Sequence, residues 1–154
     1  MPNAIALPWS DLPLSLIERH RLDLRVHERG GEREVRFDWR TRPTVLPVWW
    51  DGGLRVVRWG CRARRSKLPP TGWTWQATVE AGRWAALCPE PVTVPAAYCY
   101  TGGVWYRVKE GVQGLLVTDE RGEPVVYLIV ERPTRYFRVM TRAEWAPALV
   151  NEVI

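Results

Sequence analysis

Apolar and polar residues alternate along much of this chain, which is the pattern of strands that bury one face. Every second residue is apolar in residues 22–26 and again in 35–39, on either side of Gly30-Gly31. A period of two on both sides of a Gly-Gly turn predicts a β-hairpin. A second hairpin is predicted for residues 44–60, TVLPVWWDGGLRVVRWG, with DGG as its turn.

Further strands are predicted at residues 104–110, 112–120 and 125–132, the last two joined by the turn RGEP. Residues 61–76, CRARRSKLPPTGWTWQ, carry charges and prolines and are predicted to form a loop. Alternation in the second hairpin places consecutive tryptophans on opposite faces. It does not say which face belongs to the core.

Three segments have helical patterns. Residues 10–21, SDLPLSLIERHR, open on a serine that can cap a helix, and residues 78–87 have a weaker pattern. Thr141 and Glu144 have the spacing of a capping box for a last helix at about 141–150. Seven to nine strands with two or three short helices predict one compact α+β domain over residues 1–154, mainly antiparallel and barrel-like.

Composition excludes several function classes. No apolar run approaches the ~20 residues of a membrane span, and no signal-peptide pattern opens the chain. We therefore expect a cytoplasmic protein with no membrane partner. Cys61, Cys88 and Cys99 have no metal-ligand spacing, and only His20 and His27 accompany them. We expect reduced thiols, no metal and no cofactor, and no hydrolase, phosphate-loop or dinucleotide signature is present.

A net charge of +5 suits a polyanionic partner, although an arginine-rich codon bias would give the same excess. The placement of the arginines is more informative. Arg62, Arg64 and Arg65 precede Trp73 and Trp75, whose spacing turns both indoles to one side of an extended segment. Arginines beside exposed aromatics are typical of single-stranded nucleic-acid binding. A solvated loop closed by two core tryptophans explains the same residues.

The first two residues, Met1-Pro2, offer a second candidate chemistry. Removal of Met1 would leave Pro2 with a free secondary amine, which attacks aldehydes to form an iminium. Many proteins begin with Met-Pro without using this chemistry, so the feature alone carries little weight.

Taken in order, several segments resemble the SRAP family, the SOS-response-associated peptidases, whose known activity is to trap abasic sites in single-stranded DNA. FDWRTRPTVLPVWW resembles the family's YNIAPTQ…PV segment, QATVEA its NARAET, and VTVPAAYCY its CLVPADGFYEW. TRYFRVMTRAEWAPAL resembles HDRMPVILTPEDWDAWL, with Arg135 retained. The resemblance covers nearly the whole chain. It implies that Trp59 of the RWG strand packs inward and that Arg58 faces the DNA, with Trp49 or Trp50 at the rim.

The departures from the family are equally informative. Its mechanism closes a thiazolidine with the amine and thiol of an amino-terminal cysteine, and Pro2 has no thiol. The other motif positions differ as well: Gln76 replaces an asparagine, Thr78 an arginine, Thr101 a glutamate, and Pro133 or Thr134 a histidine. Of the ionisable groups, only Glu80 and the arginines remain.

The main hypothesis is therefore a binding module for single-stranded or abasic-site DNA that has lost the family's crosslinking chemistry. In the alternative, the Pro2 amine acts as the nucleophile of an abasic-site lyase, with Glu80 as proton shuttle. A third hypothesis is a protein-interaction domain without nucleic acid. The predicted DNA contacts are Trp49, Trp50, Arg58, Trp59, Arg62, Arg64, Arg65, Trp73, Trp75, Gln76 and Arg135.

Overall fold

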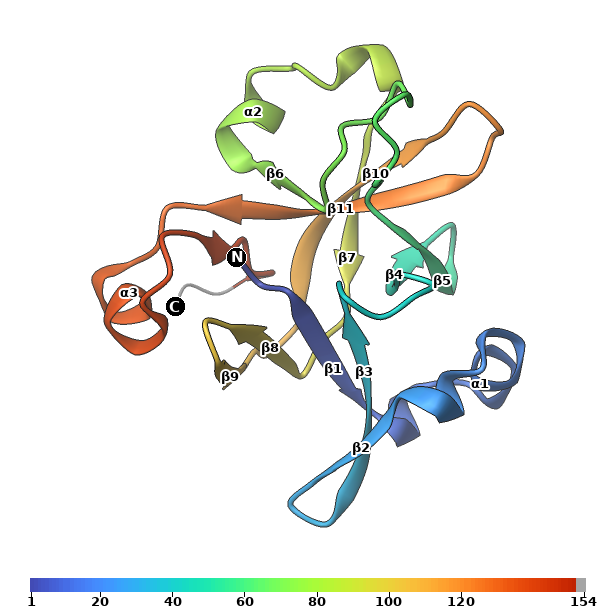
Figure 1. Cartoon of the computed structure of the whole chain (residues 1–154), viewed down its shortest axis with the longest axis vertical. Coiled ribbons are helices and arrows are strands. Elements are labelled where there is room, and N and C mark those ends of the chain that lie inside the picture. The colour runs from blue at the N-terminus through green and yellow to red at the C-terminus, as the bar shows by residue number, and fades with distance from the viewer. Residues whose placement is uncertain (152–154) are drawn as a thin grey trace.

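Two β-sheets share one hydrophobic core in this protein, for which a computed structural model describes residues 1–151 (Figure 1). The first sheet is antiparallel throughout and has the order β2-β3-β1-β8-β9. Its strands are β1 (Ala4–Pro8), β2 (Val26–Arg29), β3 (Glu32–Asp38), β8 (Tyr98–Thr101) and β9 (Val104–Arg107).

The second sheet closes on itself. Its order is β10-β7-β4-β5-β11, and β10 also pairs with β11, which completes a five-stranded barrel. The short strands β6 and β12 pair with the last residues of β11 and are not part of the barrel. The strands are β4 (Val45–Trp50), β5 (Gly53–Trp59), β6 (Trp73–Trp75), β7 (Glu90–Val94), β10 (Val112–Thr118), β11 (Pro124–Glu131) and β12 (Ala146–Pro147).

Alternating side chains connect the sheets. In β3, Val35 and Phe37 are fully buried in the shared core, whereas Arg36 and Asp38 lie on the other face of the sheet. Strand β11 is buried on both faces: Val126 belongs to the shared core, and Tyr127 to a second core under residues 61–87. This double burial explains the continuous apolar run of β11.

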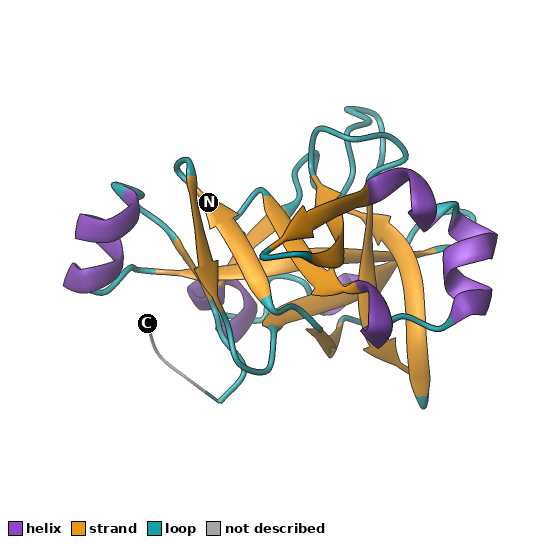
Figure 2. Ribbon diagram, turned by 90° about the horizontal axis from the view of Figure 1, so that it is seen from below, coloured by secondary structure: helices purple, strands orange, loops and turns teal. Residues whose placement is uncertain are grey.

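Three α-helices lie within residues 1–151: α1 (Leu14–His20), α2 (Gln76–Glu80) and α3 (Arg135–Thr141). Single 3₁₀ turns cover residues 9–11, 22–25 and 85–87. The strands run through the middle of the molecule, and α1 and α3 lie on opposite sides of it in both Figure 1 and Figure 2. The predicted α+β class, mainly antiparallel and barrel-like with short helices, is confirmed.

Both predicted hairpins are present, as β2–β3 and β4–β5. The predicted helix at 141–150 is wrong. Helix α3 ends where it was expected to begin, because Arg142 is left-handed and the Thr141 hydroxyl donates back to Phe137 O at 2.8 Å. The following residues form β12, which Pro147 suits better than the interior of a helix.

The first helix is shorter than predicted. Ser10 lies in a 3₁₀ turn and caps nothing, and α1 begins only after Pro13. Strand β1 was not predicted, because AIALP is apolar without alternation. It lies in the centre of its sheet between β3 and β8, so both of its edges are paired.

Candidate nucleic-acid interface

Two of the predicted DNA-contacting arginines open onto one groove. Arg58 leaves β5 on its outward face, and Arg62 follows three residues after the strand. Arg42, which the sequence analysis did not single out, completes the set from the segment before β4. We call this cavity of about 450 Å³ the arginine groove; its lining residues are Arg42, Pro43, Thr44, Val45, Arg58, Gly60, Cys61, Arg62 and Ala63.

A cluster of three tryptophans adjoins the arginine groove. The ring centroid of Trp39 lies 5.2 Å from that of Trp59 and 4.9 Å from that of Trp73. The guanidinium of Arg62 lies 4.0 Å over the Trp39 ring and also donates to the Trp39 carbonyl. This stacking holds a cation at the boundary between the groove and the cluster.

Trp59 packs inward, as the resemblance implied. It is 1% exposed, and its indole N–H donates to the Gly72 carbonyl at 2.9 Å. Direct contact between Trp59 and a ligand is therefore excluded, which corrects its assignment as a DNA contact. Trp59 instead supports the two half-buried tryptophans, Trp39 and Trp73.

Arg58 is held by a carboxylate. Its Nη2 donates to Asp119 Oδ2 at 3.1 Å, while Asp119 Oδ1 accepts the backbone N–H groups of Arg121 and Glu123. The Glu123 and Arg121 hydrogen bonds, together with the charge and hydrogen bond of Arg58, hold the pKa of the Asp119 carboxyl below its ordinary value despite burial. Half of the Arg58 side chain still reaches solvent.

The amino terminus contacts Trp73 of the tryptophan cluster. The Trp73 indole N–H donates to the Pro2 carbonyl at 2.8 Å, and Pro2 is buried. Burial lowers the pKa of the Met1 amine. The Asn3 side-chain oxygen is also buried, and no donor within residues 1–151 reaches it.

Trp73 and Trp75 face the same side, as their spacing predicted. Together with Trp84 they line a cavity of about 720 Å³ next to α2. Trp75 also contacts the edge of Trp145, which follows α3 in the chain.

The two polar candidates on α2 bond to each other. Gln76 Nε2 donates to the exposed Glu80 carboxylate at 3.2 Å. Within the described part of the chain, no hydrogen bond joins Glu80 to Pro2, the pair proposed for proton transfer.

The remaining predicted contacts are dispersed. Arg64 and Arg65 are exposed on the loop beyond the arginine groove. Trp49 is half-exposed on β4, whereas the Trp50 indole N–H donates to Glu90 at 2.9 Å. Arg135 lies on α3, on the opposite side of the molecule from β4 and β5 in Figure 1. The structure thus brings Arg58, Arg62 and Trp73 together and leaves Arg135 apart.

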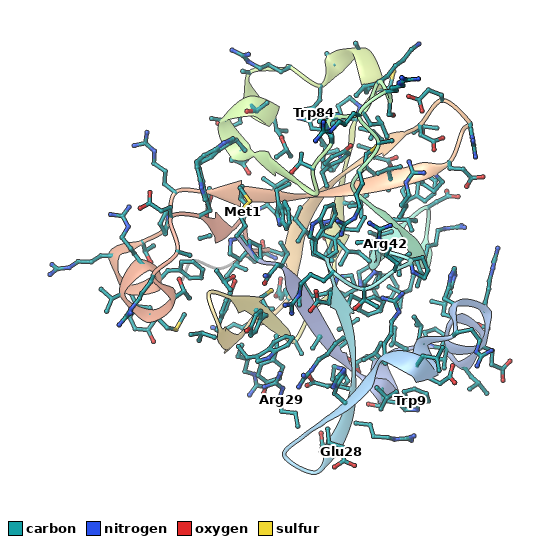
Figure 3. The ribbon with its side chains drawn as sticks, in the orientation of Figure 1. Met1, Trp9, Glu28, Arg29, Arg42 and Trp84 are labelled. Carbon is teal, nitrogen blue, oxygen red and sulfur yellow. The ribbon has the colours of Figure 1, made fainter. Side chains whose placement is uncertain are left out.

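Sequence reasoning missed a second group of arginines on the outer face of the first sheet. Arg29 lies 4.1 Å over the Tyr98 ring, and both Arg29 and Arg36 lie 4.8 Å over Trp105. Both arginines bind the buried carboxylate of Glu34. Figure 3 shows Arg42 near β4 and β5, whereas Arg29 lies beside the β2–β3 hairpin. The polar residues that alternate with apolar ones in β3, such as Arg36, were the sequence signal that could have identified this group.

Within residues 1–151, no helix combines the length and the apolar composition that a bilayer crossing requires. The same part of the chain has no group of three or more histidine, cysteine, aspartate or glutamate side chains arranged to hold a metal ion. The thiols of Cys61 and Cys99 are buried, and that of Cys88 is exposed.

No protein-family model matches this chain, and neither a curated protein nor a solved structure matches it. The resemblance to the SRAP family therefore rests on the segments quoted in the sequence analysis and stays a hypothesis.

Proposed function

We propose that this protein binds single-stranded DNA, including strands that carry abasic sites, along the arginine groove. The observation that carries the proposal is the arrangement of Arg42, Arg58 and Arg62 around one groove, with the tryptophan cluster at its end. Guanidinium groups bind phosphates with paired hydrogen bonds. Their convergence on a groove is the arrangement that follows a nucleic-acid backbone.

The tryptophans add a second contribution to binding. Arg62 of the groove lies over Trp39, Trp39 packs on Trp73, and Trp73 lines the neighbouring cavity with Trp75 and Trp84. Bases leaving the groove in this direction meet indole surfaces, and a stacked base contributes about 1–3 kcal/mol in single-strand complexes. An abasic nucleotide has no base to stack and would leave one indole surface uncovered. The phosphates and the neighbouring bases of the damaged strand could still bind.

The test compares variants of the groove with a matched surface variant. Arg42→Ala and Arg62→Ala together should weaken binding of a fluorescein-labelled oligothymidylate and reduce its salt dependence. Each lost phosphate contact lowers the slope of log K against log salt by about 0.7. Arg19→Ala, which removes an exposed arginine of α1, should leave both quantities unchanged. Equal affinity and equal slope in all variants would contradict the proposal.

A second candidate function, an abasic-site lyase, is favoured by the position of the amino terminus. The Pro2 carbonyl accepts the Trp73 indole N–H, which places the first residues beside the tryptophan cluster. After removal of Met1, the Pro2 amine would lie one residue closer to Trp73. It would add to the C1′ aldehyde with loss of water to form an iminium. Water would then take a proton from C2′ as the bond between C3′ and the phosphate oxygen breaks, and hydrolysis of the iminium would release Pro2.

Intact mass and borohydride trapping test the lyase. The mass establishes whether Met1 is present, and an oligonucleotide with one abasic site is then incubated with and without borohydride. A reduced covalent adduct that disappears when glycine is placed before Pro2 supports the lyase. Retardation of damaged and undamaged strands without an adduct supports the binding module alone. No retardation of either strand contradicts both functions and favours a protein-interaction domain.

A further inference from the structure

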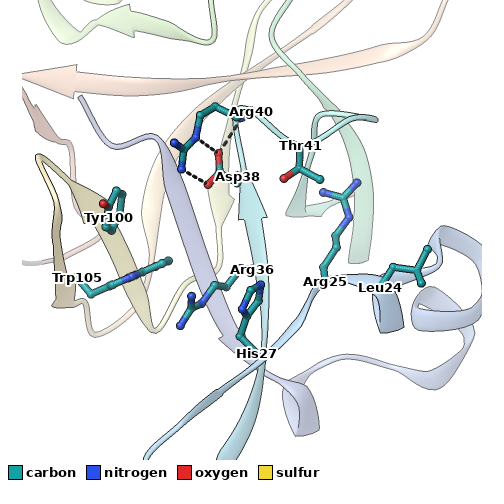
Figure 4. Close-up of a pocket in the computed structure, with 9 residues that line it drawn as sticks. All are labelled: Leu24, Arg25, His27, Arg36, Asp38, Arg40, Thr41, Tyr100 and Trp105. Carbon is teal, nitrogen blue, oxygen red and sulfur yellow. Dashed lines mark hydrogen bonds and ion pairs between the residues drawn. The ribbon is translucent and has the colours of Figure 1, made fainter.

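The outer face of the first sheet carries a cavity of about 400 Å³ that none of the preceding functions uses. Figure 4 shows it between Arg25 and Thr41 on one side and Tyr100 and Trp105 on the other, with the Arg40–Asp38 pair above. Its lining residues are Leu24, Arg25, His27, Arg36, Asp38, Arg40, Thr41, Tyr100 and Trp105.

Arg25 is the unusual member of this cavity. Its side chain enters from the 3₁₀ turn before β2, and the residue is only 7% exposed. Its Nη2 donates to the Pro43 carbonyl at 2.6 Å, but its buried Nη1 has no acceptor within residues 1–151. A buried guanidinium bound only to a neutral carbonyl is poorly compensated. Burial lowers the Arg25 pKa accordingly.

The other charges of the cavity do not compensate Arg25. Arg40 is neutralised by Asp38, with which it makes hydrogen bonds of 3.2 Å. Arg36 shares the single carboxylate of Glu34 with Arg29. Two positive charges are therefore left among these groups, and the His27 imidazole adds a hydrogen-bonding group to the lining. This excess suits a dianion better than a singly charged ligand.

The opposite wall of the cavity is aromatic. The ring centroids of Tyr100 and Trp105 are 5.0 Å apart, and both rings are partly exposed. Strand β1 runs between the two walls, where Ala4 pairs with Tyr100 and with Asp38. The Trp105 ring is already covered by the guanidiniums of Arg29 and Arg36, each 4.8 Å from its centroid, so Tyr100 is the aromatic surface left to a ligand. A ligand that spans the cavity then presents an anionic group to the arginines and a flat apolar group to Tyr100.

We propose that this cavity binds a nucleoside monophosphate unit, with its phosphate monoester between Arg25 and Arg36 and its base against Tyr100. The unit can be a free mononucleotide or the 5′-phosphorylated end of a strand. Residues 40–44 separate this cavity from the arginine groove, since Thr41 lines the one and Arg42 the other. The proposal rests on residues outside the arginine groove and holds whether or not the groove binds DNA.

Calorimetric titration of the full chain with thymidine 5′-monophosphate, thymidine and inorganic phosphate tests the proposal. The nucleotide should bind at least tenfold more tightly than either fragment. Arg25→Met should weaken nucleotide binding at least tenfold without lowering the melting temperature, because it removes a buried charge that lacks an anionic partner. Arg33→Met is the matched control, since Arg33 stacks on Trp9 and does not line the cavity.

The strand end is tested separately, with oligonucleotides that carry a 5′ phosphate or a 5′ hydroxyl. A preference for the phosphate that disappears in Arg25→Met identifies a strand end as the ligand. If Arg25→Met does not fold, Arg36→Gln serves in its place and should give the same tenfold loss. Equal binding of nucleotide and nucleoside with no preference for a 5′ phosphate, or unchanged affinity in these variants, overturns the proposal.

Discussion

In the proposed complex Asp119 would compete with DNA for Arg58, and its replacement by asparagine should therefore strengthen DNA binding. Asp119 Oδ2 accepts from Arg58 Nη2 at 3.1 Å, and Oδ1 accepts two backbone N–H groups at 2.8 and 2.9 Å. Asp119→Asn keeps an oxygen for the two backbone donors and removes the charge that restrains Arg58. The turn between β10 and β11 should keep its conformation.

The magnitude follows from the exposure of the pair. The Arg58 side chain is 47% exposed, so its ion pair with Asp119 is worth at most about 1 kcal/mol. Release of Arg58 to a phosphate should therefore tighten the dissociation constant by up to about fivefold at low salt. One additional phosphate contact should steepen the slope of log K against log salt by about 0.7.

Fluorescence anisotropy with labelled oligothymidylate, at about 50 to 200 mM salt, measures both quantities. The Arg58→Ala and Asp119→Asn/Arg58→Ala variants complete a double-mutant cycle. The gain from Asp119→Asn should disappear when Arg58 is absent. An equal gain in the Arg58→Ala background would show that only the net charge matters, and no gain in either background would remove Arg58 from the interface.

Three further predictions concern stability. Trp59→Phe removes the indole hydrogen bond to the Gly72 carbonyl, which keeps the Leu128 N–H as a donor, and should lower the free energy of unfolding by about 0.5–1.5 kcal/mol in urea titrations. Burial alone would raise the pKa of the Glu34 carboxyl, but hydrogen bonds from its two arginine partners and their charges hold that pKa below its ordinary value. The folded chain then binds fewer protons there, so the free energy of unfolding should fall as pH decreases below about 5, and Glu34→Gln should reduce this dependence. Thr134→Ala removes the side-chain cap of α3 and should cost about 1 kcal/mol, measured by thermal unfolding.

The two hairpins could be predicted because their signal is local. Alternation on both sides of Gly30-Gly31 and of Asp51-Gly52-Gly53 determines the strands, and the positive φ angles at Gly30, Gly31 and Gly52 suit glycine. The helix at 141–150 was predicted from a local capping pattern. Strand pairing of residues 146–147 with β11 prevents that helix. Ala146 instead bonds to the end of β11, a partner fifteen residues earlier in the chain.

The candidate sites show the same division. Arg62 was predicted from a short basic segment with neighbouring tryptophans and Arg58 from the resemblance to the SRAP family, and both line one groove. Arg42 and Arg25 were not singled out, because neither the basic segment nor the family resemblance assigns a DNA contact to these positions. Arg42 reaches the groove only when β4 pairs with β5, and Arg25 becomes a buried cation only when Pro43 covers it.

The sequence alone determined the class of this protein: a mainly antiparallel α+β fold with a basic, tryptophan-rich character. Tertiary structure alone decided the roles of individual tryptophans. Trp59 is sealed in the core and Trp49 is half-exposed, although both belong to one hairpin. The physical reason is that strand alternation separates two faces, whereas burial is decided by what packs on each face. In the β4–β5 hairpin, the core covers the face that carries Trp59. The face that carries Arg58 and Trp49 is left to solvent.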